Sequence, residues 1–324
     1  MIICREAACR GGWGSELVCG SVSGLTAGQR RMCKSAPDIM IALTNGITIA
    51  FAECQSQFSK HRWDCSYLGK SGHLFGYVVV VGSREAAYTY SIASAGVVYS
   101  LISACSRGEI TSCGCGTTNR KQSTKVQSNW KWAGCTLDLT LGLRIARKFL
   151  DNRETEGDAR ALMNLHNNKA GRHAVKSTLV KDCKCHGVSG SCTLKSCWMS
   201  LPRFRKVGDH LMRKYWRARH VRENTERGLI TGKANRKPKT AELVYLEQSP
   251  NYCETDLTLG SLGTKGRTCN RTLLGLGSCD ELCCGRGYNT HQQIQSWHCK
   301  CKFNWCCQVQ CQTCTKQSEI YTCK

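Results

Sequence analysis

The chain has 324 residues, of which 26 are cysteine, and a formal net charge of +23. An even number of cysteines at this density indicates a disulfide framework formed in an oxidising compartment. Four prolines and an ordinary apolar content exclude a disordered chain, and no run approaches about 18 uninterrupted apolar residues, so we do not expect an integral membrane protein.

The charge predicts an anionic partner, either a nucleic acid or an extracellular polyanion such as a sulfated glycosaminoglycan. Disulfide density favours the second. The first residues do not form a secretory signal peptide, because the apolar run of Met1 to Cys4 ends at Arg5 and Glu6. We therefore expect a leader that is missing from this chain or altered in it.

Helical patterns occupy the first half of the chain. Ser83 is placed to cap a helix that runs through Cys105 and stops at Gly108. Elsewhere apolar residues recur at helical spacing, and we interpret these stripes as core. The other ranges expected to be helical are 37–58, 136–150 and 157–173.

Residues 201–240 carry 13 Lys and Arg against three acidic residues, and Gly228, Gly232 and Pro238 break the second half of the segment. This pattern predicts a basic helix followed by an exposed linker. Two interpretations stay open for the segment: a solvated connector, or a contact for glycosaminoglycan or a co-receptor.

Cysteine becomes dense toward the end of the chain, with 12 in the 72 residues from Cys253 onward. So short a segment buries too little apolar surface to stabilise itself. Disulfides must substitute, at roughly 2–4 kcal/mol each. We expect β-hairpins with long loops here.

The stretch 183–198, CKCHGVSGSCTLKSCW, is the most informative motif. Nested pairing of its cysteines, 183 with 197 and 185 with 192, would form a hairpin, which we call the thumb (183–197). Gly187 and Gly190 supply the backbone angles that its tip needs. Ser189 would then stand at the apex.

Four interpretations compete for Ser189 and its neighbours. The order Gly-Val-Ser-Gly-Ser is not the nucleophile elbow of a hydrolase. Cys183, Cys185 and His186 lack the usual two-residue gap of a zinc site. The hairpin is otherwise either purely structural or a presenter of Ser189 for covalent modification, and composition alone does not separate these two.

A second nested set of cysteines lies at 299–314, which we call the finger. Cys306 and Cys307 are adjacent at its tip and could form a vicinal bridge. Phe303, Trp305 and Val309 would be either exposed, as a receptor hot spot, or packed inward.

The motif CKCHGVSGSC at 183–192 resembles the signature of the Wnt family of secreted signalling proteins. The resemblance extends from about residue 19 to the end of the chain. Further blocks similar to the family are RWDC at 62–65, WKWAGC at 130–135, LMNLHNN at 162–168, SPNYC at 249–253, CCGRGY at 283–288 and CKFNWCC at 301–307.

This resemblance implies a secreted ligand, in the extracellular space and matrix, for the cysteine-rich domain of Frizzled receptors, acting with an LRP-type co-receptor. It implies a mono-unsaturated fatty acyl chain on Ser189, attached by the acyltransferase Porcupine, with Wntless as export carrier. Heparan sulfate would retain the ligand. No nucleic acid partner, metal, non-covalent cofactor or catalytic residue is implied. The expected receptor contacts are His186, Val188, Phe303, Trp305, Cys306, Cys307 and Val309.

The resemblance also implies a disulfide pairing. The pairs are Cys54 with Cys65, Cys105 with Cys113, Cys115 with Cys135, Cys183 with Cys197, Cys185 with Cys192, Cys253 with Cys284, Cys269 with Cys279, Cys283 with Cys323, Cys299 with Cys314, Cys301 with Cys311 and Cys306 with Cys307. Cys19 and Cys33 are left to pair, and Cys4 and Cys9 exceed the usual complement. Asn270, in the single N-x-[ST] sequon, is the expected glycosylation site.

The expected fold class is α+β. A helical, saposin-like domain would cover 1–200 and carry the thumb, a basic linker would cover 201–248, and a cysteine-rich domain of β-hairpins would cover 249–324. The alternative is a zinc-dependent nucleic-acid-binding protein, which would also be basic and rich in cysteine. It predicts bound metal and reduced thiols, whereas the ligand predicts neither. No set of residues in the sequence supports an enzymatic function.

Overall fold

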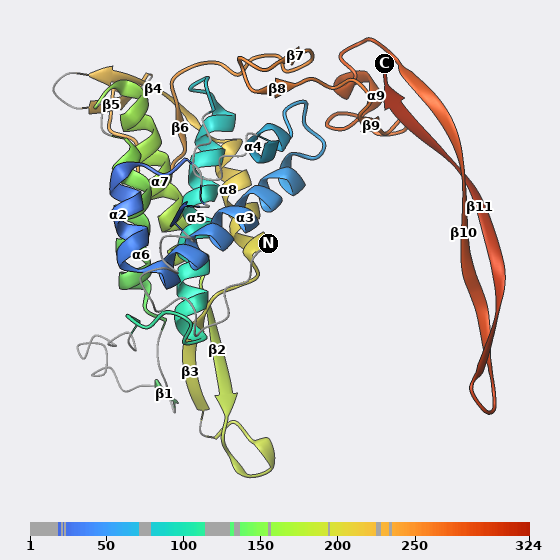
Figure 1. Cartoon of the computed structure of the whole chain (residues 1–324), viewed down its shortest axis with the longest axis horizontal. Helices are drawn as coiled ribbons and strands as arrows, with labels where there is room; N and C mark the ends of the chain where they lie inside the picture. The colour runs from blue at the N-terminus through green and yellow to red at the C-terminus, as the bar shows by residue number, and fades with distance from the viewer. Residues whose placement is uncertain are drawn as a thin grey trace. The chain divides into compact units, whose positions relative to one another are not determined.

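The computed structural model describes residues 19–20, 22, 24–70, 79–113, 130–132, 137–154, 157–193, 195–224, 228–232 and 235–324. They form two compact units. Unit 1 comprises the described residues up to Gln57 together with Cys65–Pro250, and unit 2 comprises Phe58–Asp64 and Asn251–Lys324. Unit 1 holds most of the helices, and unit 2 consists mainly of strands and loops (Figure 1).

Every helix expected from the sequence is present, with bounds shifted by a few residues at most ends. The α-helices before unit 2 are α2 Ala27–Ser35, α3 Pro37–Phe58, α4 Ser66–Lys70, α5 Arg84–Ser106, α6 Leu139–Leu150, α7 Ala159–Thr178 and α8 Phe204–Tyr215. Asp138 and Asp158 cap α6 and α7 with side-chain hydrogen bonds to backbone N–H groups. Ser83 takes the N-cap position of α5 without a capping side-chain bond.

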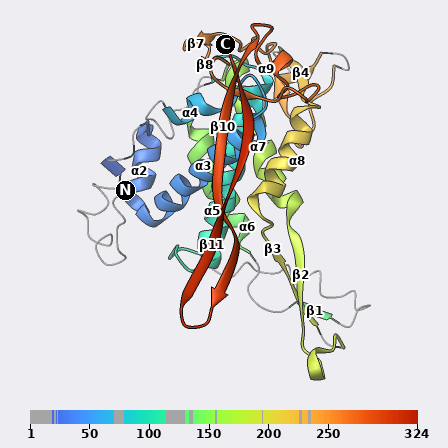
Figure 2. The same ribbon diagram turned by 90° about the vertical axis from the view of Figure 1, so that its right-hand side faces the viewer.

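Helix α5 lies at the centre of unit 1, between α3, α6, α7 and α8 (Figures 1 and 2). It is buried over nearly its whole length. Glycine permits the neighbouring backbones to approach closely, since a Cβ on Gly46 would lie 2.7 Å from the Gly96 carbonyl oxygen and one on Gly171 would overlap the backbone of Ser91. In keeping with this burial, the only charged residues of α5 are Arg84 and Glu85 in its first turn, and its other polar residues are uncharged.

The segment 201–240 begins with the expected basic helix, α8, but an exposed linker does not follow it. The chain after α8 forms the sheet β5-β4-β6, from β4 Arg219–Asn224, β5 Gly228–Thr231 and β6 Val244–Tyr245. Val221, Ile230 and Val244 are buried, and the side chain of Asn167 on α7 bonds both the N–H and the carbonyl of Val244, at 3.0 and 2.9 Å. The few apolar residues of this basic segment therefore anchor it to unit 1.

The thumb belongs to unit 1 and rests on a three-stranded sheet of order β1-β3-β2. Its strands are β1 Trp130–Trp132, β2 Val180–Cys185 and β3 Lys195–Ser200, with a short 3₁₀ turn, η4 Val188–Gly190, at the tip. β2 and β3 project beyond the helices (Figures 1 and 2). Within the described residues, β1 pairs with β3 at Lys195–Cys197, so it adds a third strand beside the thumb.

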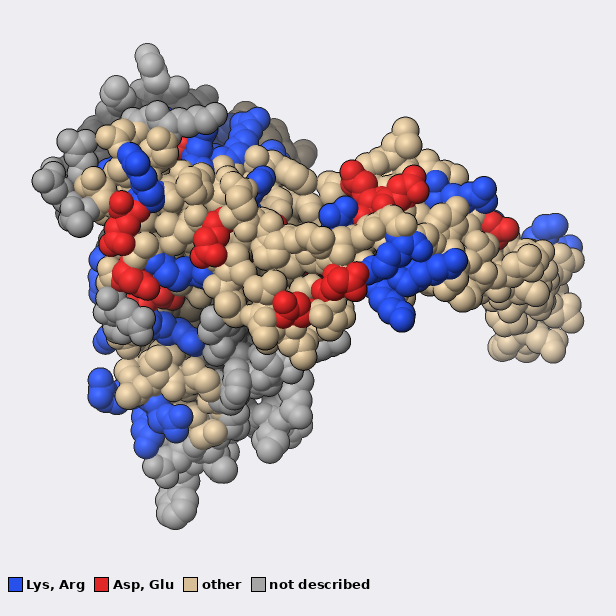
Figure 3. Space-filling view, turned by 90° about the horizontal axis from the view of Figure 1, so that it is seen from above, with Lys and Arg blue, Asp and Glu red and all other residues tan. Residues whose placement is uncertain are grey.

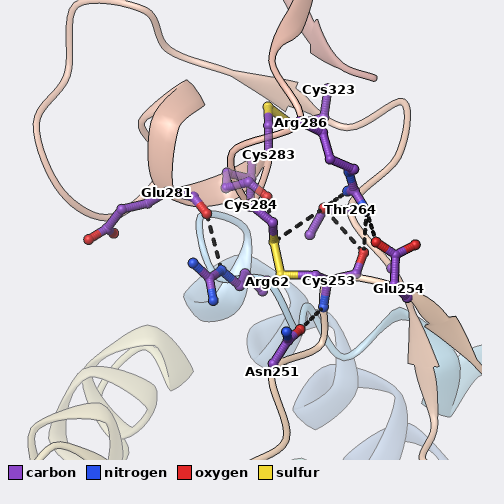
Figure 4. The surroundings of a disulfide bond; sticks show 12 residues. Arg62, Asn251, Cys253, Glu254, Thr264, Glu281, Cys283, Cys284, Arg286 and Cys323 are labelled. Carbon is purple, nitrogen blue, oxygen red and sulfur yellow. Dashed lines mark hydrogen bonds and ion pairs between the residues drawn. A yellow bond between two sulfur atoms is a disulfide. The ribbon is translucent and has the colours of Figure 1, made fainter.

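Unit 2 has a very small core, as its cysteine content predicts. Cys279, Leu282, Cys283 and Cys323 are buried, with Tyr288 and Tyr321 packed against them. The elements are β7 Thr255–Asp256, β8 Ser261–Leu262, β9 Thr268–Cys269, α9 Cys279–Leu282, β10 Tyr288–Asn304 and β11 Gln308–Cys323. Figure 4 shows the surroundings of the Cys253–Cys284 disulfide, where the Arg286 guanidinium donates to the Cys253 carbonyl oxygen and to Thr264.

The structure contains the implied disulfides wherever both cysteines are described, with one exception. The bonded pairs are 19–33, 54–65, 105–113, 183–197, 185–192, 253–284, 269–279, 283–323, 299–314 and 301–311. The exception is Cys306 and Cys307, which are thiols. Cys4, Cys9, Cys115 and Cys135 lie outside the described residues.

Arg267 holds the loop 58–64 within unit 2. Its guanidinium donates to the carbonyl oxygens of Arg62 and Ser59, at 2.6 and 3.0 Å, and lies 3.6 Å from the Asp64 carboxylate. Burial lowers the pKa of Arg267, and the Asp64 charge opposes that shift. The group stays charged because an arginine pKa is so high to begin with.

Replacing Arg267 by alanine should accelerate amide hydrogen exchange in the loop 58–64 about 100-fold, because two charge-assisted hydrogen bonds worth about 3 kcal/mol together are lost. Exchange followed by mass spectrometry of peptides measures this. The control is the exposed Lys265, whose replacement by alanine should leave the loop unchanged. Equal exchange in both variants would contradict the assigned role.

Within the described residues, no helix is both long enough and apolar enough to cross a membrane.

Candidate functional site

The thumb is a hairpin closed by two disulfides. In the antiparallel register of β2 and β3, Cys183 lies opposite Cys197, and their side chains are bonded. Cys185 and Cys192 close the tip. Each crosslink joins the two arms of the hairpin, so its conformational freedom is reduced before any partner binds.

Ser189 stands at the apex of this hairpin in a left-handed backbone conformation, with φ of 57°. Three backbone hydrogen bonds shape the tip: Gly187 N–H to the Ser191 carbonyl oxygen at 2.9 Å, Gly190 N–H to that of Gly187 at 3.0 Å, and Ser191 N–H to that of Val188 at 3.2 Å. A Cβ on Gly187 would lie 2.5 Å from the Ser191 carbonyl oxygen, so glycine is required there. The tip is a defined turn.

The apex is open to solvent. Val188 is 90% exposed, and Ser189 and His186 are exposed as well. Within the part of the chain that is described, the Ser189 hydroxyl makes no hydrogen bond to a histidine or a carboxylate. The arrangement suits a hydroxyl that an external enzyme modifies and lacks the base that would activate a nucleophile.

The finger lies at the far end of a hairpin made by β10 and β11, which pair from Tyr288 opposite Cys323 to Asn304 opposite Gln308 (Figure 2). The disulfides 299–314 and 301–311 crosslink it. The register shifts between Cys299 and Lys302. Such a bulge twists a hairpin and redirects the side chains beyond it.

Three apolar side chains at the finger tip are exposed. Phe303 is 71%, Trp305 87% and Val309 59% accessible, and Phe303 pairs with Val309 across the strands. The structure therefore excludes the inward-packed interpretation. Large apolar side chains held in solvent on a crosslinked hairpin are typical of a protein-binding surface.

Cys306 and Cys307 correct one expected pairing. Their sulfur atoms are 4.0 Å apart and both residues adopt positive φ, 72° and 79°, in the turn. A bond between adjacent cysteines must close a small ring through the peptide, and this turn holds the two sulfur atoms too far apart for it. Both thiols are exposed beside Trp305.

Among the cysteines that the structure describes, the sulfur atoms that lie close together are unsuited to a zinc site. Cys269, Cys283 and Cys323 lie within 4.8 Å of one another, but each belongs to a disulfide. Cys183 and Cys185, the cysteines of the other candidate, are also oxidised. A disulfide sulfur carries no thiolate charge, so neither set fits the metal.

On the face shown in Figure 3, basic side chains form several separate groups, with acidic and uncharged side chains between them. Several are paired with acids, including Arg172 with Asp151 and Arg236 with Glu242, both at 2.9 Å. Glu242 has a pKa below its ordinary value because hydrogen bonds and the Arg236 charge outweigh its burial. Such pairs lower the positive potential around these arginines, while the net charge of the chain stays +23.

The sequence model described as the wnt family matches residues 21–324. The chain belongs to the Wnt family. Wnt family members are secreted signalling proteins and are not enzymes. The fold is the α+β Wnt fold, with a helical N-terminal part and disulfide-rich hairpins after it.

One curated relative and one solved structure agree with this assignment. Protein Wnt-2 of Drosophila melanogaster is 50% identical over 328 residues, covering 96% of this chain and 93% of the relative. A chain in the solved complex of human WLS with WNT8A is 36% identical with a TM-score of 0.64, covering 88% of this chain and 93% of that one. The N-terminal domain and linker of Drosophila WntD is 22% identical with a TM-score of 0.47, covering 66% and 98%.

Proposed function

We propose that this Wnt protein is a ligand of Frizzled receptors whose main anchor is a mono-unsaturated acyl chain on Ser189. One observation carries the proposal: the hydroxyl of Ser189 is exposed at the apex of a hairpin closed by two disulfides. Each methylene buried in a receptor groove contributes about 0.8 kcal/mol, so a single chain can dominate an interface.

The finger supplies the second contact in this proposal. Phe303, Trp305 and Val309 would meet the cysteine-rich domain of the receptor, with Cys306 and Cys307 beside them, while His186 and Val188 contact it around the lipid. The exposure of these side chains supports the assignment. An LRP-type co-receptor bound at the same time would be brought close to the Frizzled receptor. In this mechanism the ligand bridges two receptors and neither forms nor breaks a covalent bond.

Other partners follow from the lipid and the charge. Porcupine would acylate Ser189, and Wntless would carry the acylated protein; similarity to a chain in the complex of human WLS with WNT8A supports the second step. The net charge of +23 supports retention by heparan sulfate in the extracellular matrix. Exposed Lys and Arg would make that contact.

The mass of the proteolytic peptide that contains Ser189 tests the proposal, on protein made in cells that express the acyltransferase. We expect an acyl adduct on Ser189 that mild alkali removes, because it is an ester. An unmodified Ser189 in correctly oxidised protein would overturn the lipid-dependent mechanism.

Asn270 is the proposed glycosylation site, and Asn270→Gln should remove one glycan. The residue is exposed, and the hydroxyl of Thr272 donates to its Oδ1 at 2.9 Å, which leaves the amide nitrogen free to accept a sugar. We expect faster gel migration, and no further change on treatment with peptide N-glycosidase. Thr272→Ser keeps the sequon and should retain the glycan; a glycan that survives in Asn270→Gln would place the modification elsewhere.

A further inference from the structure

Besides its apolar tip, the finger has a groove to which the proposed function assigns no role. It has a volume of about 940 Å³, and its lining includes His298, Lys300 and Lys302 from β10 and Val309, Gln310 and Gln312 from β11. The bulge between Cys299 and Lys302 forms it, since Lys300 adopts a left-handed conformation with φ of 47°. The Cys301–Cys311 disulfide closes the hairpin at this level.

The chemistry of the lining is cationic with one apolar wall. Lys300 and Lys302 provide two ammonium groups, and His298 provides a ring that carries a charge when protonated. The sequence from Tyr288 to Ser318 contains no aspartate or glutamate, and Glu319, the acidic residue of β11, pairs with Gln292 toward the base of the hairpin, away from the groove. An anion that entered the groove would meet attraction from the lysines and amide donors from the glutamines.

The groove also shares a residue with the exposed tip. Val309 lines it and pairs with Phe303 on the adjoining surface. A protein that covers Phe303 and Trp305 therefore extends over the mouth of the groove. The finger presents an apolar contact and an anion-binding contact side by side.

We propose that this groove binds a carboxylate side chain, Asp or Glu, of the same receptor domain that the finger tip contacts. The inference rests on the proposed function and names the chemistry of its second contact. A sulfated polysaccharide is the other anionic candidate, but a long polyanion suits an extended row of cations, whereas this site is a single concavity with an apolar wall. A charged pair at the edge of an apolar contact mainly accelerates association and sets orientation.

The test compares Lys302→Glu with Lys316→Glu. Lys316 is exposed on β11 of the same hairpin, opposite Gln295, and does not line the groove. Both variants change the net charge equally, so only position differs. The acylated proteins are bound to the isolated cysteine-rich domain of a Frizzled receptor, and association and dissociation rates are measured over a range of salt concentrations.

Lys302→Glu should slow association about tenfold at low salt and flatten its salt dependence, whereas Lys316→Glu should change it less than about twofold. Lys300→Glu should behave as Lys302→Glu does. Equal rates for all three variants would overturn the groove while leaving receptor binding intact. Loss of heparin affinity in the groove variants with unchanged receptor association would assign the groove to sulfate, against the proposal. Failure of the acylated unmutated protein to bind would instead overturn the proposed function, and the groove assignment with it.

Discussion

Replacing Ser189 by alanine should abolish acylation and raise the dissociation constant for the receptor domain about a thousand-fold. Burial of only five methylenes, at about 0.8 kcal/mol each, accounts for about 4 kcal/mol, and each 1.4 kcal/mol is a factor of ten. The finger tip remains, so residual binding persists. Protein extracted from the producing cells with detergent is compared by binding kinetics, because export itself depends on the lipid in the proposed route.

Ser191→Ala is the matched control for this substitution. Ser191 is an exposed serine in the same tip, two residues along, and its hydroxyl lies 3.3 Å from that of Thr193. It lies off the apex, so its loss should leave acylation of Ser189 and receptor affinity unchanged. An acyl chain found on Ser191 in the Ser189→Ala variant, or affinity retained within a few-fold, would mean that the apex position does not select the modified residue.

The helices of unit 1 were predicted well from local patterns, because each buries a continuous stripe of apolar residues that shows in the sequence as helical spacing. The spacing of apolar residues over 37–58 predicted α3 to its exact bounds, and Gly108 follows the end of α5 closely. Helices α2 and α4 were not predicted: they are 9 and 5 residues long, too short to show a clear period.

The sheet of β4, β5 and β6 could not be predicted from its composition. Its charge and its glycines are typical of a solvated linker, yet it is fixed by a contact distant in sequence, from Asn167 on α7 to Val244. A two-residue strand such as β6 has no period to detect. Hydrogen bonds between residues distant in sequence therefore determine that the segment forms a sheet attached to unit 1.

For the thumb and the finger, the disulfides could be predicted from the sequence but the groove could not. The resemblance predicted the four disulfides that close them, because cysteine spacing is shared by a whole family, but it also implied a Cys306–Cys307 bond that the structure does not contain. The groove beside Lys300 was not predictable, since it depends on a register shift that neither composition nor spacing reveals. The only signal in the sequence was the absence of acidic residues from Tyr288 to Ser318. It indicates a positively charged segment but says nothing about a groove.

Gly171→Ala, at the crossing of α5 and α7, should strongly destabilise unit 1. A Cβ at this position would overlap the carbonyl of Ser91 and lie 2.7 Å from its carbon and 2.9 Å from its Cα. Backbone atoms cannot turn aside as a side chain can, so the helices must separate. We expect a loss of about 3 kcal/mol or more in the free energy of unfolding, with a fall of about 6–12 °C in the melting temperature of unit 1.

Gly232→Ala is the control, because among the described residues the added Cβ would contact only the His220 ring nitrogen, at an ordinary 3.7 Å. Its melting temperature should match that of the unmutated protein. Gly96→Ala, at the crossing of α3 and α5, should behave as Gly171→Ala does, since its Cβ would overlap the carbonyl of Gly46. If Gly171→Ala on α7 and Gly96→Ala on α5 both melted normally, the close packing around α5 would not limit stability. If they melted early while keeping the acyl chain on Ser189, the thumb would fold independently of the helices that support its base.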